Sequence, residues 1–172
     1  MGVSVDGFVS TPDGWPVLLS MPEFVGAASY GLPELLGECG AVVMGRTTFE
    51  PALGAPKWPW PGLEVFVLTS SPLPEGTPEG IVTAADPAAL LERMRAADFE
   101  GDVHLVGGPR TVQAFHAIGA LDELGVVLLP LVVGSGLPFS SSGIEMARLE
   151  LESHRAFPDG AVELLYLPEA EH

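Results

Sequence analysis

A short apolar run, two glycines and a helix start follow one another between Asp102 and Phe115. Val103–Val106 has the length and composition of a buried strand, which the glycine pair then ends. Pro109 stands where a helix can begin, because its missing N–H is not needed in a first turn. Glycine lets an anion approach the backbone closely, and a helix N-terminus offers unpaired N–H donors. The stretch therefore predicts a tight strand-to-helix turn that is either empty or binds a phosphate.

Two other apolar runs end in residues that suit a phosphate. Ala41–Met44 is followed by Gly45 and Arg46. Glu64–Leu68 is followed by three hydroxyl residues at positions 69 to 71. The carboxyl ends of parallel strands meet at one edge of a sheet, and ligands of such sheets bind there. Because all three runs end in this way, we expect a phosphate-bearing ligand at that edge rather than three empty turns.

The charge of the chain narrows the choice of partner. A formal net charge of −16 argues against a nucleic-acid surface and against an anionic membrane surface. There are only seven Lys and Arg residues, and two of them, Arg46 and Arg110, lie beside the glycine turns. This placement suits a local anion in an otherwise acidic protein, although solvent-facing arginines would explain it equally well.

Length and composition predict one globular domain. The chain has 172 residues, of which 47% are hydrophobic, enough for a sizeable core. No apolar run is long enough to cross a bilayer and no signal peptide is visible, so we expect a cytoplasmic protein. Cys39 is the only cysteine, which excludes an internal disulfide and cysteine-based zinc sites. The four histidines have no ligand spacing, and we expect no metal site.

The order of the expected elements predicts the fold class. A first strand is expected at Val3–Val9, and three strand-then-helix units precede a hairpin with strands at 147–157 and 161–167. One helix is expected from Asp86 to about Ala97, whereas Pro51 should end the helix after Gly45 early. The pattern predicts an α/β fold whose mixed sheet has a parallel centre, an antiparallel C-terminal hairpin and helices on both faces.

Several motifs resemble those of dihydrofolate reductase-like proteins and occur in the same order: residues 5–8 (VDGF), 42–50 (VVMGRTTFE), 68–71 (LTSS) and 105–108 (LVGG). The tail is similar, more narrowly, to the reductase domain of the bifunctional deaminase-reductase of riboflavin synthesis and its stand-alone relatives, in residues 129–139 (LPLVVGSGLPF) and 153–160 (SHRAFPDG). The resemblance spans nearly the whole chain. It implies a single dihydrofolate reductase-like domain over residues 1–172.

The resemblance implies NADPH as the cofactor. The residues that it places around the pyrophosphate and the adenosine phosphate are Gly45, Arg46, Thr47 and Thr48. Those that it places along the ribose and its 2′-phosphate are Thr69, Ser70 and Ser71. Gly107 and Gly108, joined in this family by a cis peptide, would approach the pyrophosphate with Arg110, Thr111 and Val112. Arginine and hydroxyl donors satisfy phosphate oxygens, so each implied role agrees with the chemistry of the residues.

Candidates near a substrate are fewer. True dihydrofolate reductases hold the pterin with an acid on the helix before the second strand, and that position falls here near Ser29 or Tyr30. Neither is a carboxylate, so folate reduction is not expected. The catalytic candidates are Asp6, which could contact a substrate or only favour an Asp-Gly turn, and Glu34, which could be a solvated helix residue.

We therefore expect an NADPH-dependent reductase that transfers a hydride to a small heterocyclic or carbonyl substrate, closer to the riboflavin-synthesis reductases than to a folate reductase. The alternative is a nucleotide- or ligand-binding protein that kept the fold without turnover. A third reading is a structural dimer module whose strand-end turns are empty. The resemblance also implies a homodimer.

Overall fold

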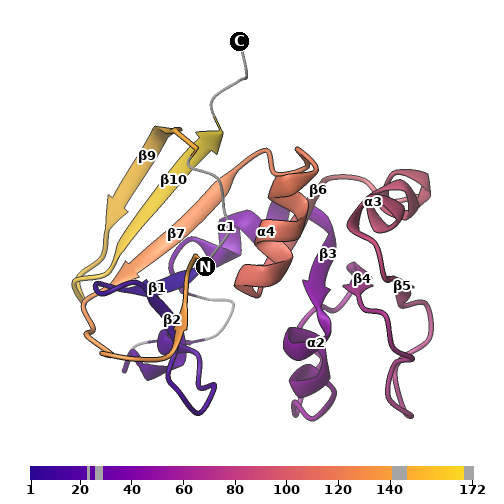
Figure 1. The fold of residues 1–172 in the computed structure, drawn as a ribbon, viewed down its shortest axis with the longest axis horizontal. Coiled ribbons are helices and arrows are strands. Elements are labelled where there is room, and N and C mark those ends of the chain that lie inside the picture. The colour runs from indigo at the N-terminus through magenta and orange to yellow at the C-terminus, as the bar shows by residue number, and fades with distance from the viewer. Residues whose placement is uncertain (23, 26–28, 141–146, 169–172) are drawn as a thin grey trace. The chain divides into compact units, whose positions relative to one another are not determined.

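The computed structural model describes residues 1–22, 24–25, 29–140 and 147–168, and Figure 1 shows their helices and strands. Contacts divide the chain into two compact units, the first made of Met1–Pro33 with Leu121–His172 and the second of Glu34–Ala120. The single domain expected from the sequence stays a prediction. No helix in the described ranges is both long enough and apolar enough to cross a bilayer.

The second unit contains a parallel sheet with the strand order β5-β4-β3-β6. Its strands are β3 (Cys39–Gly45), β4 (Glu64–Leu68), β5 (Val82–Ala84) and β6 (Asp102–Gly107). Residue Val43 of β3 pairs with Phe66 of β4 on one side and with Leu105 of β6 on the other. The predicted parallel centre is therefore confirmed, and β4 has the bounds expected from the sequence.

Helices cover both faces of this parallel sheet, as predicted. On one face, Val43 packs with Phe66 and with α3 (Pro87–Ala96) and α4 (Pro109–Ala117). On the other face, Met44 packs with Phe49 of α2 (Arg46–Leu53). Residues 41 to 44 of β3 are at most 3% exposed, so this strand is buried on both sides. A continuous apolar run is what such a strand requires.

The start of α3 follows its sequence signal. Asp86 precedes the helix, and its carboxylate accepts a hydrogen bond from the N–H of Ala89 at 2.9 Å. Pro87 occupies the first turn, where its missing N–H has no cost. Leu90 and Met94 point into the core. The predicted N-cap is confirmed.

The prediction for Pro51 was wrong, because α2 continues through it to Leu53. A proline inside a helix removes one backbone hydrogen bond. Here the side chain of Phe49, which is completely buried, anchors the helix against β3 and β4. Tertiary packing therefore outweighs the local cost, and the helix ends two residues after the proline.

The first unit holds the antiparallel part of the fold. Its main sheet has the order β1-β7-β10-β9, with β1 (Gly2–Ser4), β7 (Leu124–Leu129), β10 (Val162–Pro168) and β9 (Leu149–Ala156). A hairpin joins β9 to β10, as predicted, and β1 runs parallel to β7. A smaller sheet pairs β2 (Phe8–Ser10) with β8 (Leu137–Pro138). This unit also contains η1 (Val17–Ser20), whereas α1 (Leu32–Glu38) lies mostly in the second unit, which begins at Glu34.

The mixed α/β class is confirmed, but two details differ from the sequence prediction. The parallel strands and the hairpin are hydrogen-bonded in separate sheets rather than in one mixed sheet. The expected strand Val3–Val9 is also broken in two, because a turn forms where the N–H of Gly7 donates to the carbonyl of Ser4 at 2.9 Å. The first half then pairs with β7 and the second half with β8.

We predict that Asp86→Ala lowers the free energy of unfolding by about 1 kcal/mol, because the helix α3 loses its N-cap acceptor. Asp86→Ser removes the same charge but keeps a capping oxygen, so it should lose much less. Urea unfolding followed by circular dichroism measures both. Equal losses in the two variants would show that charge, not capping, is responsible.

Candidate functional site

Two helices of the second unit begin directly after parallel strands. Gly45 is the N-cap residue between β3 and α2, and Gly108 is the N-cap residue between β6 and α4. Neither helix has a side-chain cap, in contrast to α3, which Asp86 caps. The first N–H groups of a helix lack partners within the helix, so an anion can take the place of the missing cap.

These two helix starts lie against each other. The hydroxyl of Thr48, in the first turn of α2, lies 3.5 Å from the carbonyl oxygen of Gly107. A Cβ atom on Gly45 would lie 2.7 Å from the hydroxyl oxygen of Thr111 on α4. A Cβ atom on Gly108 would lie 3.5 Å from that same oxygen. We call Gly45, Thr48, Gly108 and Thr111 the N-terminal corner.

The Gly107–Gly108 link differs from the expectation that the resemblance gave. There is no cis peptide bond among the described residues, so this link is trans. Both glycines have positive φ angles, 140° and 90°, which other residues rarely adopt. Gly107 is buried and Gly108 is half-buried, so Gly108 is the more accessible of the two.

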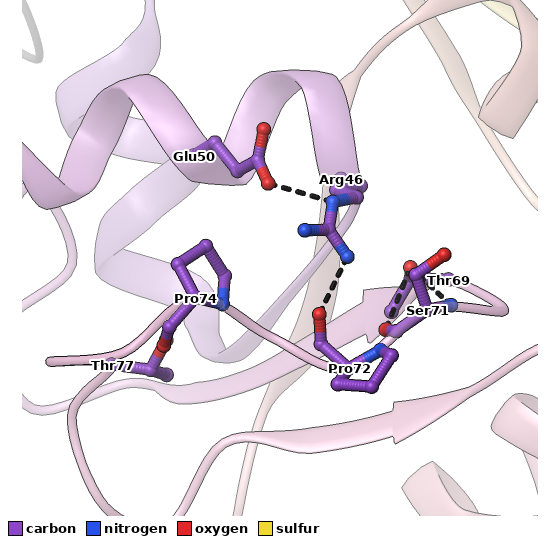
Figure 2. A network of polar contacts seen from close by, with 7 residues as sticks. All are labelled: Arg46, Glu50, Thr69, Ser71, Pro72, Pro74 and Thr77. Carbon is purple, nitrogen blue, oxygen red and sulfur yellow. Dashed lines mark hydrogen bonds and ion pairs between the residues drawn. The ribbon is translucent and has the colours of Figure 1, made fainter.

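Arg46 connects the start of α2 to the loop after β4 (Figure 2). Its Nε donates to a carboxylate oxygen of Glu50 at 2.6 Å, and its Nη1 donates to the carbonyl of Pro72 at 2.6 Å. In the same loop the N–H of Ser71 donates to the hydroxyl of Thr69 at 3.2 Å. The guanidinium is therefore held beside the predicted hydroxyl residues. The ion pair contributes little stability, because the side chains of Arg46 and Glu50 are 33% and 41% exposed.

The remaining predicted cofactor residues surround these groups. Thr47 and Arg110 are exposed in the first turns of α2 and α4, and Ser70 is exposed in the loop after β4. The N–H groups of Thr111 and Val112 both donate to the carbonyl of Gly108, at 2.9 and 3.1 Å, so those two donors are used within the helix. Within the second unit, the structure thus brings the ends of β3, β4 and β6 together, as the strand-end residues predicted.

Two contacts of Arg46 at this edge of the sheet were not predicted from the sequence. Glu50 belongs to the motif at residues 42–50, but no contact was predicted for it. Its spacing of four residues from Arg46 is typical of an ion pair on a helix. The carbonyl of Pro72 gave no signal, because an acceptor on the backbone can be found only once the loop is placed.

Asp6, the first catalytic candidate, lies in the first unit, where hydrogen bonds from the protein occupy its carboxylate. Its carboxylate accepts hydrogen bonds from the hydroxyl of Ser4 and from the N–H groups of Val133 and Gly134. The bonds from Ser4 and Gly134, followed by that from Val133, lower the pKa of Asp6 to about 2. A proton donor needs a carboxyl group that keeps its proton near neutral pH, so this environment favours the turn interpretation over the catalytic one.

The other candidates near a substrate are also occupied or peripheral. Glu34 is exposed in the first turn of α1. Tyr30, one of the two residues near which the resemblance places the acid of folate reductases, is buried, and its hydroxyl donates to the carboxylate of Asp159. His104, on β6, was not a predicted site residue; burial lowers its pKa to about 4, so this side chain is neutral at pH 7.

Known proteins share this sequence pattern. The pattern of the RibD C-terminal domain family matches residues 1–162. The uncharacterized protein YwjB of Bacillus subtilis (strain 168) is 27% identical over 172 residues, which cover 97% of this chain and 94% of YwjB.

Solved structures share the fold. A protein of Shewanella sp. PV-4, whose name assigns it provisionally to riboflavin biosynthesis, has a TM-score of 0.82 at 21% identity, over 99% of this chain and 97% of that one. The diaminohydroxyphosphoribosylaminopyrimidine deaminase/5-amino-6-(5-phosphoribosylamino)uracil reductase of Thermotoga maritima has a TM-score of 0.66 at 15% identity, over 97% and 54%. Dihydrofolate reductase of Enterococcus faecalis, complexed with NADP(H), has a TM-score of 0.65 at 18% identity, over 98% and 94%. The dihydrofolate reductase-like fold is thereby confirmed.

We predict that Gly45→Ala destabilises the protein by about 1–3 kcal/mol, because its Cβ would meet the hydroxyl oxygen of Thr111 at 2.7 Å. The double variant Gly45→Ala/Thr111→Ala should lose less than the sum of the two single variants. Gly37→Ala, where a Cβ meets nothing within 4 Å, is the control and should not destabilise. Additive losses in the double variant would contradict the close approach.

Proposed function

The chain belongs to the RibD C-terminal domain family, and we propose that it is an NADPH-dependent reductase of a small heterocyclic or carbonyl substrate. The observation that carries this proposal is the N-terminal corner, where two helices without side-chain caps begin against each other. Each helix N-terminus carries about half a positive charge. In a chain with a net charge of −16, such a corner is a local site for an anion.

The pyrophosphate of the cofactor would bind at the N-terminal corner. Gly108 has no Cβ to hold the phosphates away from the backbone, whereas the hydroxyl of Thr111 already lies against Gly45, and the hydroxyl of Thr48 lies 3.5 Å from the carbonyl oxygen of Gly107. Arg110, exposed in the first turn of α4, adds a positive charge beside them. When bound, NADPH supplies the hydride for the reduction.

Arg46 would bind the 2′-phosphate that distinguishes NADPH from NADH. An arginine has five N–H donors, and two of the nitrogens of Arg46 already bond to Glu50 and Pro72. The hydroxyls of Ser70 and Ser71 would supply further donors in the adjacent loop, whereas the hydroxyl of Thr69 donates to the carbonyl of Ser71 at 3.2 Å. A phosphate dianion in this position would compete with Glu50 for the guanidinium.

The named relatives support a reductase and a heterocyclic substrate. The Enterococcus protein is a dihydrofolate reductase complexed with NADP(H), and the name of the Thermotoga protein includes a uracil reductase. The name of the Shewanella protein refers to riboflavin biosynthesis. The resemblance places the acid of folate reductases near Ser29 or Tyr30, and neither is a carboxylate, so we favour a substrate of the riboflavin-synthesis type over a folate.

We predict that NADPH quenches tryptophan fluorescence at much lower concentration than NADH does, and that Arg46→Ala removes this preference. Loss of a charged hydrogen bond of about 1.5–3 kcal/mol corresponds to roughly 10- to 100-fold weaker NADPH binding. Arg95→Ala is a matched control, since Arg95 also pairs with a glutamate on its own helix, at 3.0 Å, and should bind NADPH normally. Equally negligible responses of the wild type to both nucleotides would contradict the proposal.

One observation favours the alternative, a ligand-binding protein without turnover. Asp6, one of the two predicted catalytic carboxylates, is held ionised by its hydrogen bonds and is unsuited to donate a proton. The decisive measurement follows NADPH absorbance with a panel of pterins, flavin precursors and quinones. Oxidation of NADPH with one of these compounds supports the reductase, whereas NADPH binding without oxidation by any of them supports the alternative.

A further inference from the structure

The segment from residue 131 to residue 139 is fastened to the beginning of the chain within the first unit. The N–H of Val5 donates to the carbonyl of Leu131, and the N–H of Phe139 donates to the carbonyl of Gly7, both at 2.9 Å. Between these bonds, β8 pairs with β2. The segment is thus held at both of its ends, and the positions of the residues between them depend on further contacts.

The carboxylate of Asp6 supplies the contact in the middle. It accepts from the N–H of Gly134 at 2.7 Å and from the N–H of Val133 at 3.1 Å. On its other side it accepts from the hydroxyl of Ser4 at 2.6 Å, and the oxygen of that hydroxyl accepts from the N–H of Phe8 at 2.9 Å. We call the carboxylate and these donors the Asp6 clasp; it joins parts of the chain 128 residues apart.

Two residues after the clasp, the segment approaches the start of the chain very closely. A Cβ atom on Gly136 would lie 1.9 Å from the carbonyl oxygen of Ser10, and the φ angle of Gly136 is 150°. Only glycine is compatible with this contact. The positions of residues 133 to 136 are therefore set by the clasp on one side and by this contact on the other.

Ser135 and Gly136 of this segment also line an open, shallow cavity of about 540 Å³. Residues 135–137 line one side, and the turn residues Ser10, Thr11, Pro12 and Gly14 line the other. Three of the described lining residues, Ser10, Thr11 and Ser135, carry hydroxyl groups, the others are glycine, proline or leucine, and none of them is charged. The hydroxyl of Thr11 also donates to the carboxylate of Asp13 at 2.5 Å. The only Lys or Arg residues in the first unit are Arg148 and Arg155.

We propose that Asp6 is a positioning residue, whose clasp sets residues 133–136 and so places Ser135 and Gly136 in the lining of an open cavity that takes an uncharged, hydroxyl-bearing small molecule. Hydroxyl groups and backbone groups bind sugar-like hydroxyls well, whereas a phosphate would find no cation in the described lining. The identification of this molecule with the substrate rests on the proposed function. The clasp and the preference for uncharged ligands do not.

The clasp is tested by hydrogen exchange of the Val133 and Gly134 amides, measured by NMR. Asp6→Ala should accelerate both by at least about 10-fold, because their shared acceptor is lost. Asp6→Asn keeps one acceptor oxygen and should fall between the wild type and Asp6→Ala. Asp122→Asn removes an exposed charge from the same unit and should change nothing. Unchanged exchange in both Asp6 variants would overturn the proposal.

The cavity is tested with uridine and its 5′-phosphate, an uncharged and a charged form of one probe. Uridine should shift the amide signals of residues 135–137 and bind about 10-fold more weakly to Asp6→Ala, with partial recovery in Asp6→Asn. Uridine 5′-phosphate should bind more weakly than uridine. If uridine leaves these signals unchanged while NADPH binds, this proposal fails and the proposed function stands. If uridine shifts these signals while NADPH fails to bind, the proposed function fails and this proposal stands.

Discussion

The burial of β3 on both faces is the constraint from which the second unit follows. Its residues 41 to 44 alternate between two cores, so the strand needs parallel neighbours on both edges and helices on both sides. Parallel neighbours end at the same edge of a sheet. The helix that follows β3 and the helix that follows β6 therefore start next to each other, and Gly45 meets Thr111 there. The candidate cofactor site is thus a product of the way in which this unit buries its apolar residues.

Local signals predicted much of the fold, and long-range contacts account for the errors. The bounds of β4, the cap at Asp86 and the C-terminal hairpin all depend on neighbouring residues, and all were predicted. The prediction that Pro51 ends α2 early was wrong, because the burial of Phe49 that keeps α2 helical depends on two strands of the sheet. The partners of β1 and β2 lie more than 120 residues away, and no pattern within the first ten residues identifies them.

The candidate site shows the same division. Glycines and hydroxyl residues after apolar strands predicted which residues gather at the sheet edge, and the structure brings Gly45, Thr48, Gly108 and Thr111 together. The role of Asp6 needed the placement of Gly134 and could not be read from its own neighbourhood. Four points stay predictions, because each concerns a molecule other than this chain or its place in the cell: the nucleotide, the substrate, the homodimer and the compartment.

The contacts of Arg46 have a consequence for affinity. A free arginine side chain loses up to about 2 kcal/mol of rotamer entropy when it is ordered. Glu50 and Pro72 already order this one, so most of that entropy is lost when the protein folds and little is left to lose when a ligand arrives. Glu50 partly neutralises the guanidinium, but together with Pro72 it also preorganises this side chain for the anion that we propose.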